Sequence, residues 1–178
     1  MISGLFGKKG NPVAQWGQIC FAQLYFAGFF SLLAFIPYIQ SAVYQPFFVL
    51  MVFALIWVYD SGAYLIGSWK GKHRLFKRIS PRKSWEGLLG GLLIVIIISI
   101  ELSFKFTVLP CYQWLIFALI TVVSATFGDL LESLIKRTYG KKDSGKILPG
   151  HGGVFDRFDS AIMASPFIYI YLEWVIRS

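Results

Sequence analysis

One segment of the sequence carries charged side chains at helical spacing. Two carboxylates, a hydroxyl and an ammonium group fall at positions i, i+3, i+4 and i+7: Asp129, Glu132, Ser133 and Lys136. A helix over this segment would align all four in one stripe. Carboxylates on one face are suitable ligands for a hard divalent cation such as Mg²⁺, which binds a few carboxylates together with phosphate oxygens of a substrate.

A second segment repeats this pattern. If a helix begins near Phe155, the side chains of Asp156, Asp159 and Ser160 share a face. Two helices that offer carboxylates to one cleft predict a magnesium site, with Asp129 and Asp156 as the metal ligands. The alternative is that acids near a membrane surface pair with neighbouring Lys and Arg. That alternative stays open for three of them: Glu132, Asp143 and Glu86.

The chain between these two segments is rich in glycine. It contains the pentapeptide PGHGG, Pro149–Gly153, just before the second predicted helix. Glycine backbone can approach a ligand closely, and successive N–H groups in such a turn suit anions. A tight turn at the membrane surface would look the same. The neighbouring cations favour a phosphate site: Lys142, Lys146 and Arg157.

A further carboxylate, Asp60, lies near the end of another apolar segment. A charged side chain within a membrane span costs about 2.5–3.5 kcal/mol at the centre, and such residues usually mark function. Downstream, the sequence ISPRKSWEG, Ile79–Gly87, breaks at Ser80-Pro81. It predicts a helix that starts from Ser84, with Glu86 in its first turn.

The composition indicates what positions these residues. The chain has 178 residues, of which 56% are hydrophobic and only 15% are charged, whereas about a quarter of the residues are charged in a typical soluble domain. We therefore predict an all-α, polytopic integral membrane protein with a single domain over residues 1–178. Five stretches are long and apolar enough to span a bilayer: Gly17–Ile39, Pro46–Ile66, Gly87–Phe104, Cys111–Phe127 and Ser160–Ile176.

Basic residues are concentrated in two loops. The Trp69–Trp85 loop holds seven of them and the loop from Lys136 to Arg157 holds six, together 13 of the 17 in the chain. With five spans, both loops and the amino terminus lie on one side, which the positive-inside rule makes cytoplasmic. The net charge of +8 then predicts contact with anionic lipid headgroups rather than with nucleic acid.

The polar motifs resemble those of a known family. The run SLIKRTYGKKDSGKILPGHGGVFDRFD, Ser133–Asp159, is similar to the signature of the phosphatidate cytidylyltransferases, or CDP-diacylglycerol synthases. Three further segments look like family motifs: DSGAYLIGSWKGKHRL, ISPRKSWEG and GDLLESLIKR. Members of this family usually carry additional amino-terminal spans, so the resemblance places this chain in the C-terminal part of the family's fold.

The resemblance implies a function. Members transfer CMP from CTP to phosphatidic acid, giving CDP-diacylglycerol and pyrophosphate. They depend on Mg²⁺, with more than one metal ion expected, and form homodimers. It also implies an active site that faces the cytoplasm in a bacterial inner membrane. Carried onto this sequence, the catalytic residues would be Asp129, Asp156, Asp159, Lys136, Arg137 and Arg157. Substrate-binding residues would be Asp60, Ser80, Lys83, Glu86, Lys142, Asp143, Gly150, His151, Gly152 and Gly153.

Three other functions remain as alternatives. A CTP-dependent lipid-alcohol kinase of related architecture would transfer the γ-phosphate and release CDP. A transporter would use Asp60 and Asp129 as ligands along a pathway, and a non-enzymatic lipid-binding protein would need neither. The absence of an evident covalent nucleophile in the motifs fits the cytidylyltransferase reaction, in which an already ionised lipid phosphate attacks the nucleotide.

Overall fold

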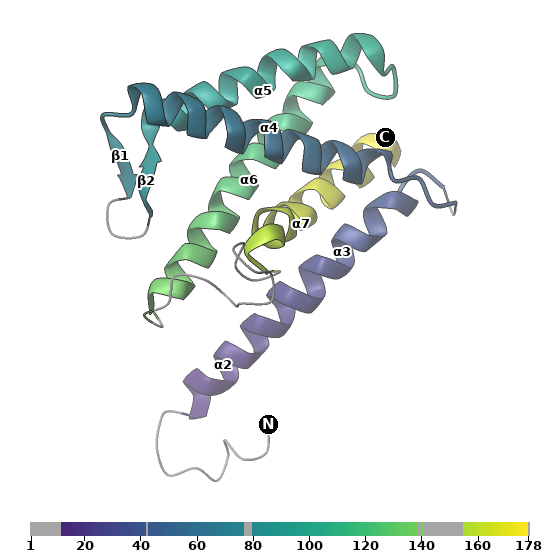
Figure 1. Ribbon diagram of the computed structural model, residues 1–178. Helices are drawn as coiled ribbons and strands as arrows, with labels where there is room; N and C mark the ends of the chain where they lie inside the picture. Colours follow the sequence, from purple (N-terminus) through teal and green to yellow (C-terminus); the bar gives the residue numbers. More distant parts are fainter. Residues whose placement is uncertain (1–11, 42, 77–79, 139, 141–154, 178) are drawn as a thin grey trace.

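The structure is a computed structural model that describes residues 12–41, 43–76, 80–138, 140 and 155–177 (Figure 1). Its elements are α2 (Pro12–Gln23), a π-helical turn (Leu24–Gly28), α3 (Phe29–Phe35), a 3₁₀ turn (Ile36–Tyr38), α4 (Phe47–Lys70), β1 (Arg74–Phe76), β2 (Ser80–Ser84), α5 (Trp85–Lys105), α6 (Cys111–Thr138) and α7 (Phe155–Arg177). The all-α prediction is confirmed, with one small addition. The loop between α4 and α5 forms an antiparallel hairpin from β1 and β2.

Four helical segments in the described part of the chain are long and apolar enough to cross a membrane: Gln15–Tyr38, Phe47–Lys70, Trp85–Lys105 and Cys111–Thr138. They match the first four predicted spans. The fifth prediction falls on α7, which is a helix of 23 residues but is not one of these four. Acidic residues near both of its ends lower its hydropathy, namely Asp156, Asp159 and Glu173. The predicted count of five spans is therefore not confirmed, and the orientation stays a prediction.

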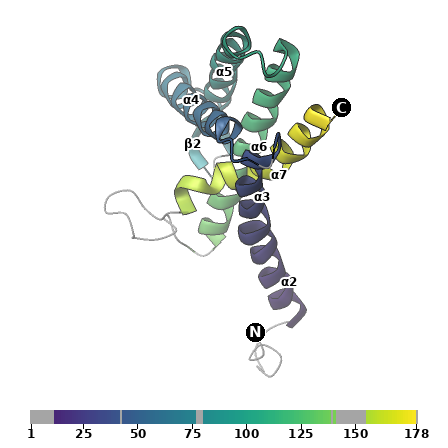
Figure 2. The ribbon, with the colours of Figure 1, turned by 90° about the vertical axis from the view of Figure 1, so that its right-hand side faces the viewer.

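Helices α4 and α5 lie side by side in both ribbon views (Figures 1 and 2). Glycines set their close approach. A Cβ atom on Gly91 would lie 2.8 Å from the carbonyl oxygen of Tyr59, and one on Gly87 would lie 2.6 Å from that of Ala63. Because real Cβ atoms do not come so close to backbone, the two helices can pack this tightly only with glycine at these positions.

Helices α6 and α7 also meet at a glycine. A Cβ atom on Gly128 would lie 2.8 Å from both the Asp159 carbonyl oxygen and the Met163 Cβ. Helix α3 packs on the other side of α7, where the Ser165 hydroxyl donates to the Phe29 carbonyl oxygen at 2.6 Å. The segment α2 leads away from the bundle in both views.

The fully buried apolar core lies where α4 and α6 begin and α7 ends. Its largest members are Trp114, Phe48, Phe117, Ile168 and Leu172. Trp114 and Phe117 meet edge to face with their ring centroids 5.8 Å apart, an arrangement that aromatic rings favour. This core holds one end of the bundle together, and the polar residues gather at the other end.

Candidate active site

Helices α6 and α7 bring three carboxylates together. Oxygen atoms of Asp129, Glu132 and Asp159 all lie within 4.8 Å of one another. Glu132 and Asp159 are buried, at 2% and 6% exposure. We call these three residues the carboxylate cluster. They meet because Gly128 lets the two helix backbones touch one residue before Asp129.

Lys136 lies beside the carboxylate cluster. Its Nζ is 2.7 Å from Oε2 of Glu132, one helical turn away, and 3.1 Å from Oδ1 of Asp156 at the start of α7. The Ser133 hydroxyl lies 3.5 Å from Oδ1 of Asp129. The predicted stripe on α6 is therefore confirmed, and so is the start of α7 at Phe155.

Asp156, one of the two predicted metal ligands, contacts Lys136 and is not one of the three acids within 4.8 Å of each other. The other predicted ligand, Asp129, belongs to the cluster. Glu132 both pairs with a lysine and belongs to the cluster, so the two interpretations of this residue do not exclude each other. The role of Asp156 as a metal ligand stays a prediction.

The hairpin supplies a second lysine. Nζ of Lys83, on β2, forms an ion pair with Oδ2 of Asp129 on α6. Both side chains are about one-third exposed, at 27% and 33%, so the contact is accessible from outside. Lys83 and Lys136 thus approach the carboxylate cluster from two different elements.

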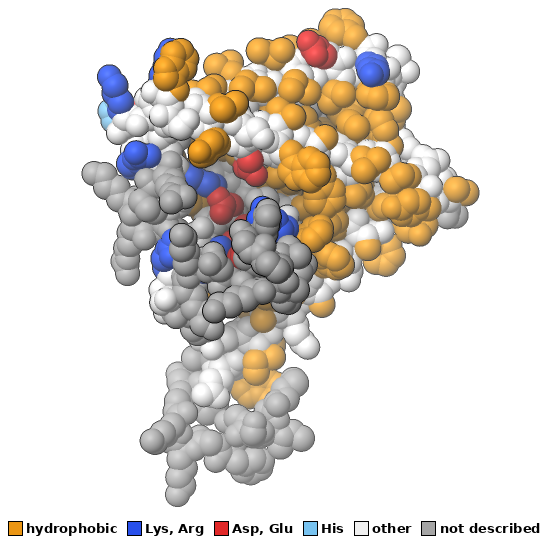
Figure 3. All heavy atoms as spheres, in the orientation of Figure 1, with side chains coloured by type: hydrophobic (Ala, Val, Ile, Leu, Met, Phe, Trp, Pro, Cys, Tyr) orange, Lys and Arg blue, Asp and Glu red, His pale blue; other side chains and the backbone are white. Residues whose placement is uncertain are grey.

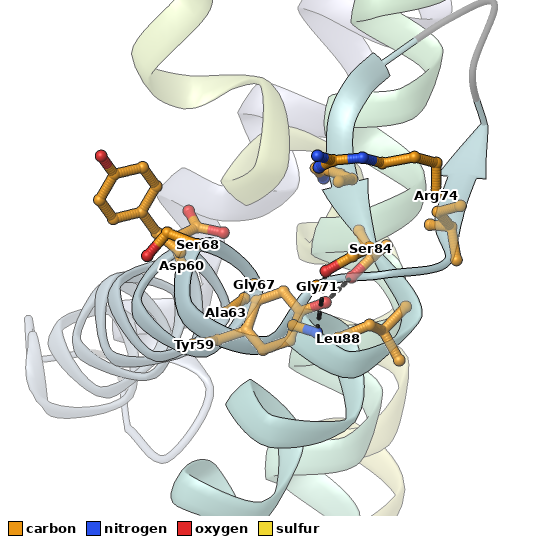
Figure 4. A pocket seen from close by; sticks show the side chains of 14 residues that line it. Tyr59, Asp60, Ala63, Gly67, Ser68, Gly71, Arg74, Ser84 and Leu88 are labelled. Atoms are coloured by element: carbon orange, nitrogen blue, oxygen red, sulfur yellow. Dashed lines mark hydrogen bonds between the residues drawn. The ribbon is translucent and has the colours of Figure 1, made fainter.

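A cavity of about 590 Å³ opens beside this ion pair. Such a volume falls within the range of small-molecule sites. Its polar lining comes from α4, the hairpin and α6: Tyr59, Asp60, Tyr64, Ser68, Arg74, Lys83, Ser84 and Thr126. In Figure 4, Asp60 extends from α4, and the Arg74 side chain crosses from β1 toward β2. Figure 3 shows acidic and basic side chains gathered on this part of the surface, while hydrophobic side chains cover much of the remaining face.

Not every predicted site residue is found in the lining of this cavity. Glu86 contacts His73 and does not line the cavity. Ser80 is half-buried in β2 and is also absent from the lining. Arg137 and Arg157 are exposed near the facing ends of α6 and α7. Six predicted residues fall outside the described part of the chain: Lys142, Asp143, Gly150, His151, Gly152 and Gly153.

The structure adds residues that sequence reasoning missed. Tyr25 belongs to the π-helical turn Leu24–Gly28, and its hydroxyl donates to the Asp159 carbonyl oxygen at 3.4 Å. On the cavity wall, the Thr126 hydroxyl and the Tyr59 hydroxyl are 2.9 Å apart. Each of these polar groups sits within an apolar stretch, where its sequence neighbours indicate only a buried helix.

One buried oxygen atom of the carboxylate cluster has a feature typical of a ligand site. Oε1 of Glu132 has no hydrogen-bond partner among the described residues. Leaving a buried carboxylate oxygen without a partner is costly, so such groups usually bind something. Three carboxylates with an open oxygen match the ligands that Mg²⁺ prefers. The donor set therefore fits a hard divalent cation.

The comparison with known proteins agrees with this geometry. The sequence profile described as "Cytidylyltransferase family" matches residues 1–175. The chain belongs to this family. Similar curated proteins are named phosphatidate cytidylyltransferase. Those of Staphylococcus haemolyticus and Staphylococcus epidermidis are 44% identical over 128 residues, covering 70% of this chain and 48% of theirs. That of Staphylococcus aureus is 42% identical over 127 residues, with the same coverage. The chain thus spans about half the length of the curated relatives it matches.

Proposed function

We propose that this cytidylyltransferase-family chain transfers CMP from CTP to phosphatidic acid. A phosphate oxygen of the lipid attacks the α-phosphorus of CTP, the bond to the β-phosphate oxygen breaks, and pyrophosphate leaves as CDP-diacylglycerol forms. The observation that carries this proposal is the buried carboxylate cluster with a lysine on each side, beside a polar cavity. The names of the relatives support the choice of substrates.

Asp129, Glu132 and Asp159 would hold Mg²⁺. Asp156 is linked to this cluster through Lys136, which contacts both Asp156 and Glu132. Bound there, magnesium would stabilise the negative charge that develops on the phosphates. More than one ion would fit four acids contributed by two helices. The acids come from the rigid pair α6 and α7, so their oxygens are already in place before substrate arrives.

The two lysines would bind the phosphates. Lys83 and Lys136 each pair with a carboxylate, and each could turn its ammonium group to a phosphate oxygen. Positive charge fixed beside the reacting atoms is a large contribution to such reactions. Because the lipid phosphate is already ionised near neutral pH, the side chains need only position and neutralise the reactants.

The cavity is the natural place for the nucleotide. It lies beside the Lys83–Asp129 pair and offers both charged and hydroxyl groups. Asp60 and Arg74 on its wall would contact polar parts of the nucleotide. The lipid would reach the cluster from the bilayer, as expected for a protein with four helices able to span it.

The same proposal includes the setting of the protein. The basic loops predict an active site on the cytoplasmic face, in contact with anionic lipids, and the family resemblance implies a bacterial inner membrane. A homodimer is the assembly that the family resemblance implies.

The reaction is tested with the purified chain in detergent micelles. CTP, Mg²⁺ and phosphatidic acid should yield pyrophosphate and a CDP-lipid in equal amounts. Release of CDP with a lipid alcohol as acceptor would favour the kinase instead. No turnover with either acceptor would contradict an enzymatic role for this chain.

A further inference from the structure

The hairpin is fastened at its open end by one carboxylate. The Glu86 side chain accepts a hydrogen bond from the backbone N–H of His73, at 3.1 and 3.2 Å from its two oxygens. Nδ1 of the His73 ring lies 2.6 Å from Oε1 of the same carboxylate. The backbone N–H of Trp85 donates to the His73 carbonyl oxygen at 3.0 Å. His73 is therefore joined to the first turn of α5 through three of its groups.

We call His73 and Glu86 the clasp. His73 directly precedes β1, and Glu86 comes two residues after β2. Between them, Arg74 pairs with Ser84 across the two strands. The clasp thus joins the two ends of the chain segment that contains the β1–β2 hairpin.

The other side of this junction is closely packed. The Ser84 hydroxyl accepts from the Gly87 N–H at 3.2 Å and caps α5. A Cβ atom on Gly71 would lie 2.7 Å from that hydroxyl oxygen. The hairpin base is therefore held against the ends of α4 and α5, and the clasp adds the connection that reaches the residue before β1.

The strand that the clasp holds in place carries Lys83. This lysine is the neighbour of Ser84 on β2, and its ammonium group must cross to α6 to pair with Asp129. A two-stranded hairpin is only marginally stable by itself in water. Without the clasp, the strand that carries Lys83 would lose a fixed point, and the lysine would visit the carboxylate cluster for only part of the time.

We propose that His73 and Glu86 are positioning residues, which hold the hairpin so that Lys83 stays at the carboxylate cluster, and that neither touches the substrate. Neither residue lines the cavity beside the Lys83–Asp129 pair. Both line a second hollow with Lys72 and Arg74, and both oxygens of Glu86 there accept from the His73 N–H. This role for Glu86 differs from the substrate-binding role that the family resemblance implies. The part of the proposal that concerns catalysis rests on the proposed function.

The first experiment does not depend on that function. Amide hydrogen exchange of the hairpin is measured by mass spectrometry in the purified protein. Glu86→Ala should speed exchange in residues 72–84 by about tenfold or more, since protection reports local opening. Glu86→Gln, which keeps an acceptor for the His73 N–H, should speed it less. Glu101→Ala removes an exposed acid from the same helix and serves as the control. Unchanged exchange in Glu86→Ala would overturn the proposal.

The second experiment asks whether Glu86 acts through Lys83. Glu86→Ala alone should lower the rate of CDP-lipid formation by about 10- to 100-fold, as is usual for groups that orient a functional side chain. In a Lys83→Ala background, Glu86→Ala should lower the rate of CDP-lipid formation by less than about twofold, because the lysine that Glu86 positions is gone. If Glu86→Ala lowered the rate by the same factor in both backgrounds, Glu86 would act independently of Lys83, and this result would overturn the proposal. His73→Ala should behave as Glu86→Ala does in both backgrounds.

The two experiments separate two failures. If the unmodified chain makes no CDP-lipid, the proposed function fails while hydrogen exchange still decides whether the clasp holds the hairpin. If the chain is active and Glu86→Ala is active at the normal rate, the clasp has no positioning role and the proposed function stands.

Discussion

The helix pairs α4/α5 and α6/α7 both pack closely at a glycine, but the residues around the two contacts differ. Gly91 of α5 and Gly128 of α6 each face the backbone of a partner helix, and a Cβ atom at either position would lie 2.8 Å from a partner carbonyl oxygen. Around Gly91 the neighbours are Tyr59 and Ala63 of α4. Around Gly128 the neighbouring helix turns carry the carboxylate cluster.

The difference lies in what surrounds each contact. The pair α4 and α5 closes over apolar and small side chains, and its outcome is a fixed base for the hairpin. The pair α6 and α7 closes over acids that repel one another, and two lysines offset part of that repulsion. Close packing therefore stabilises the first pair and, in the second, holds together charges that would otherwise separate. A ligand that neutralises the acids should matter to the second pair alone.

The largest effect is expected from removing a carboxylate charge. Asp129→Asn and Asp156→Asn should each lower the rate of CDP-lipid formation by about 10³-fold, because the carboxylates that would hold the phosphate-binding cation are lost. Expression and membrane insertion should stay normal. The rate of pyrophosphate release measures the loss, with Glu101→Gln on α5 as the control. Near-normal turnover in either variant would remove that residue from the proposed site.

Magnesium should stabilise the second pair. For a cation that binds only the folded protein, a concentration 100 times its dissociation constant adds about 2.7 kcal/mol of stability. Thermal unfolding in detergent should show this gain for the unmodified protein and little of it for Asp159→Asn. Without Mg²⁺, Asp159→Asn should unfold at a higher temperature than the unmodified protein, because one repelling charge is gone. A magnesium response that survives in this variant would exclude Asp159 as a ligand.

Equal steric changes at the two glycines should have unequal consequences for the site. Gly91→Ala and Gly128→Ala should each destabilise the protein by about 1–3 kcal/mol, since both overpack a backbone contact. Only Gly128→Ala should weaken the stabilisation by Mg²⁺, because it separates α6 from α7 at the carboxylate cluster. Thermal unfolding with and without Mg²⁺ measures both quantities. Equal weakening by Gly91→Ala would mean that the two pairs are not independent.

The smallest effect is expected where a glycine meets nothing. A Cβ atom on Gly17 has no neighbour within 4 Å. Gly17→Ala should therefore leave the free energy of unfolding unchanged or raise it by no more than about 1 kcal/mol, because alanine favours the helix. Thermal unfolding measures the change. A loss like that of Gly91→Ala would show that Gly17 has a packing partner.

Much of the architecture followed from local sequence patterns. Four of the five predicted stretches were confirmed as helices long and apolar enough to cross a membrane, because a run of about 20 apolar residues admits few alternatives. The stripe on α6 was confirmed because the spacing of Asp129, Glu132 and Lys136 fixes their shared face once a helix forms. The starts of α5 after Ser84 and of α7 at Phe155 were also confirmed. The fifth span was not, since its charged residues leave α7 outside the set of apolar helices.

The hairpin escaped prediction for a physical reason. Its strands have only three and five residues and are rich in basic side chains, so no apolar alternation marks them. The sequence indicates for Glu86 either pairing with nearby Lys and Arg or substrate binding, and it indicates no role for His73. Their contact depends on how the chain folds back between α4 and α5, and local spacing does not contain that information.

By itself, the sequence determined the membrane helices, the family resemblance and the residue types available for phosphate chemistry. Those properties follow from hydropathy and from helical periodicity, which act over neighbouring residues. Only the tertiary structure decided which acids meet. Asp159 lies beside Asp129 and Glu132 because Gly128 allows the backbones of α6 and α7 to approach closely. Lys83 of the hairpin contacts Asp129 of α6. Asp156 contacts Lys136. Each of these contacts joins residues that are far apart in the sequence, and the packing of the helices and the hairpin sets the distances between them.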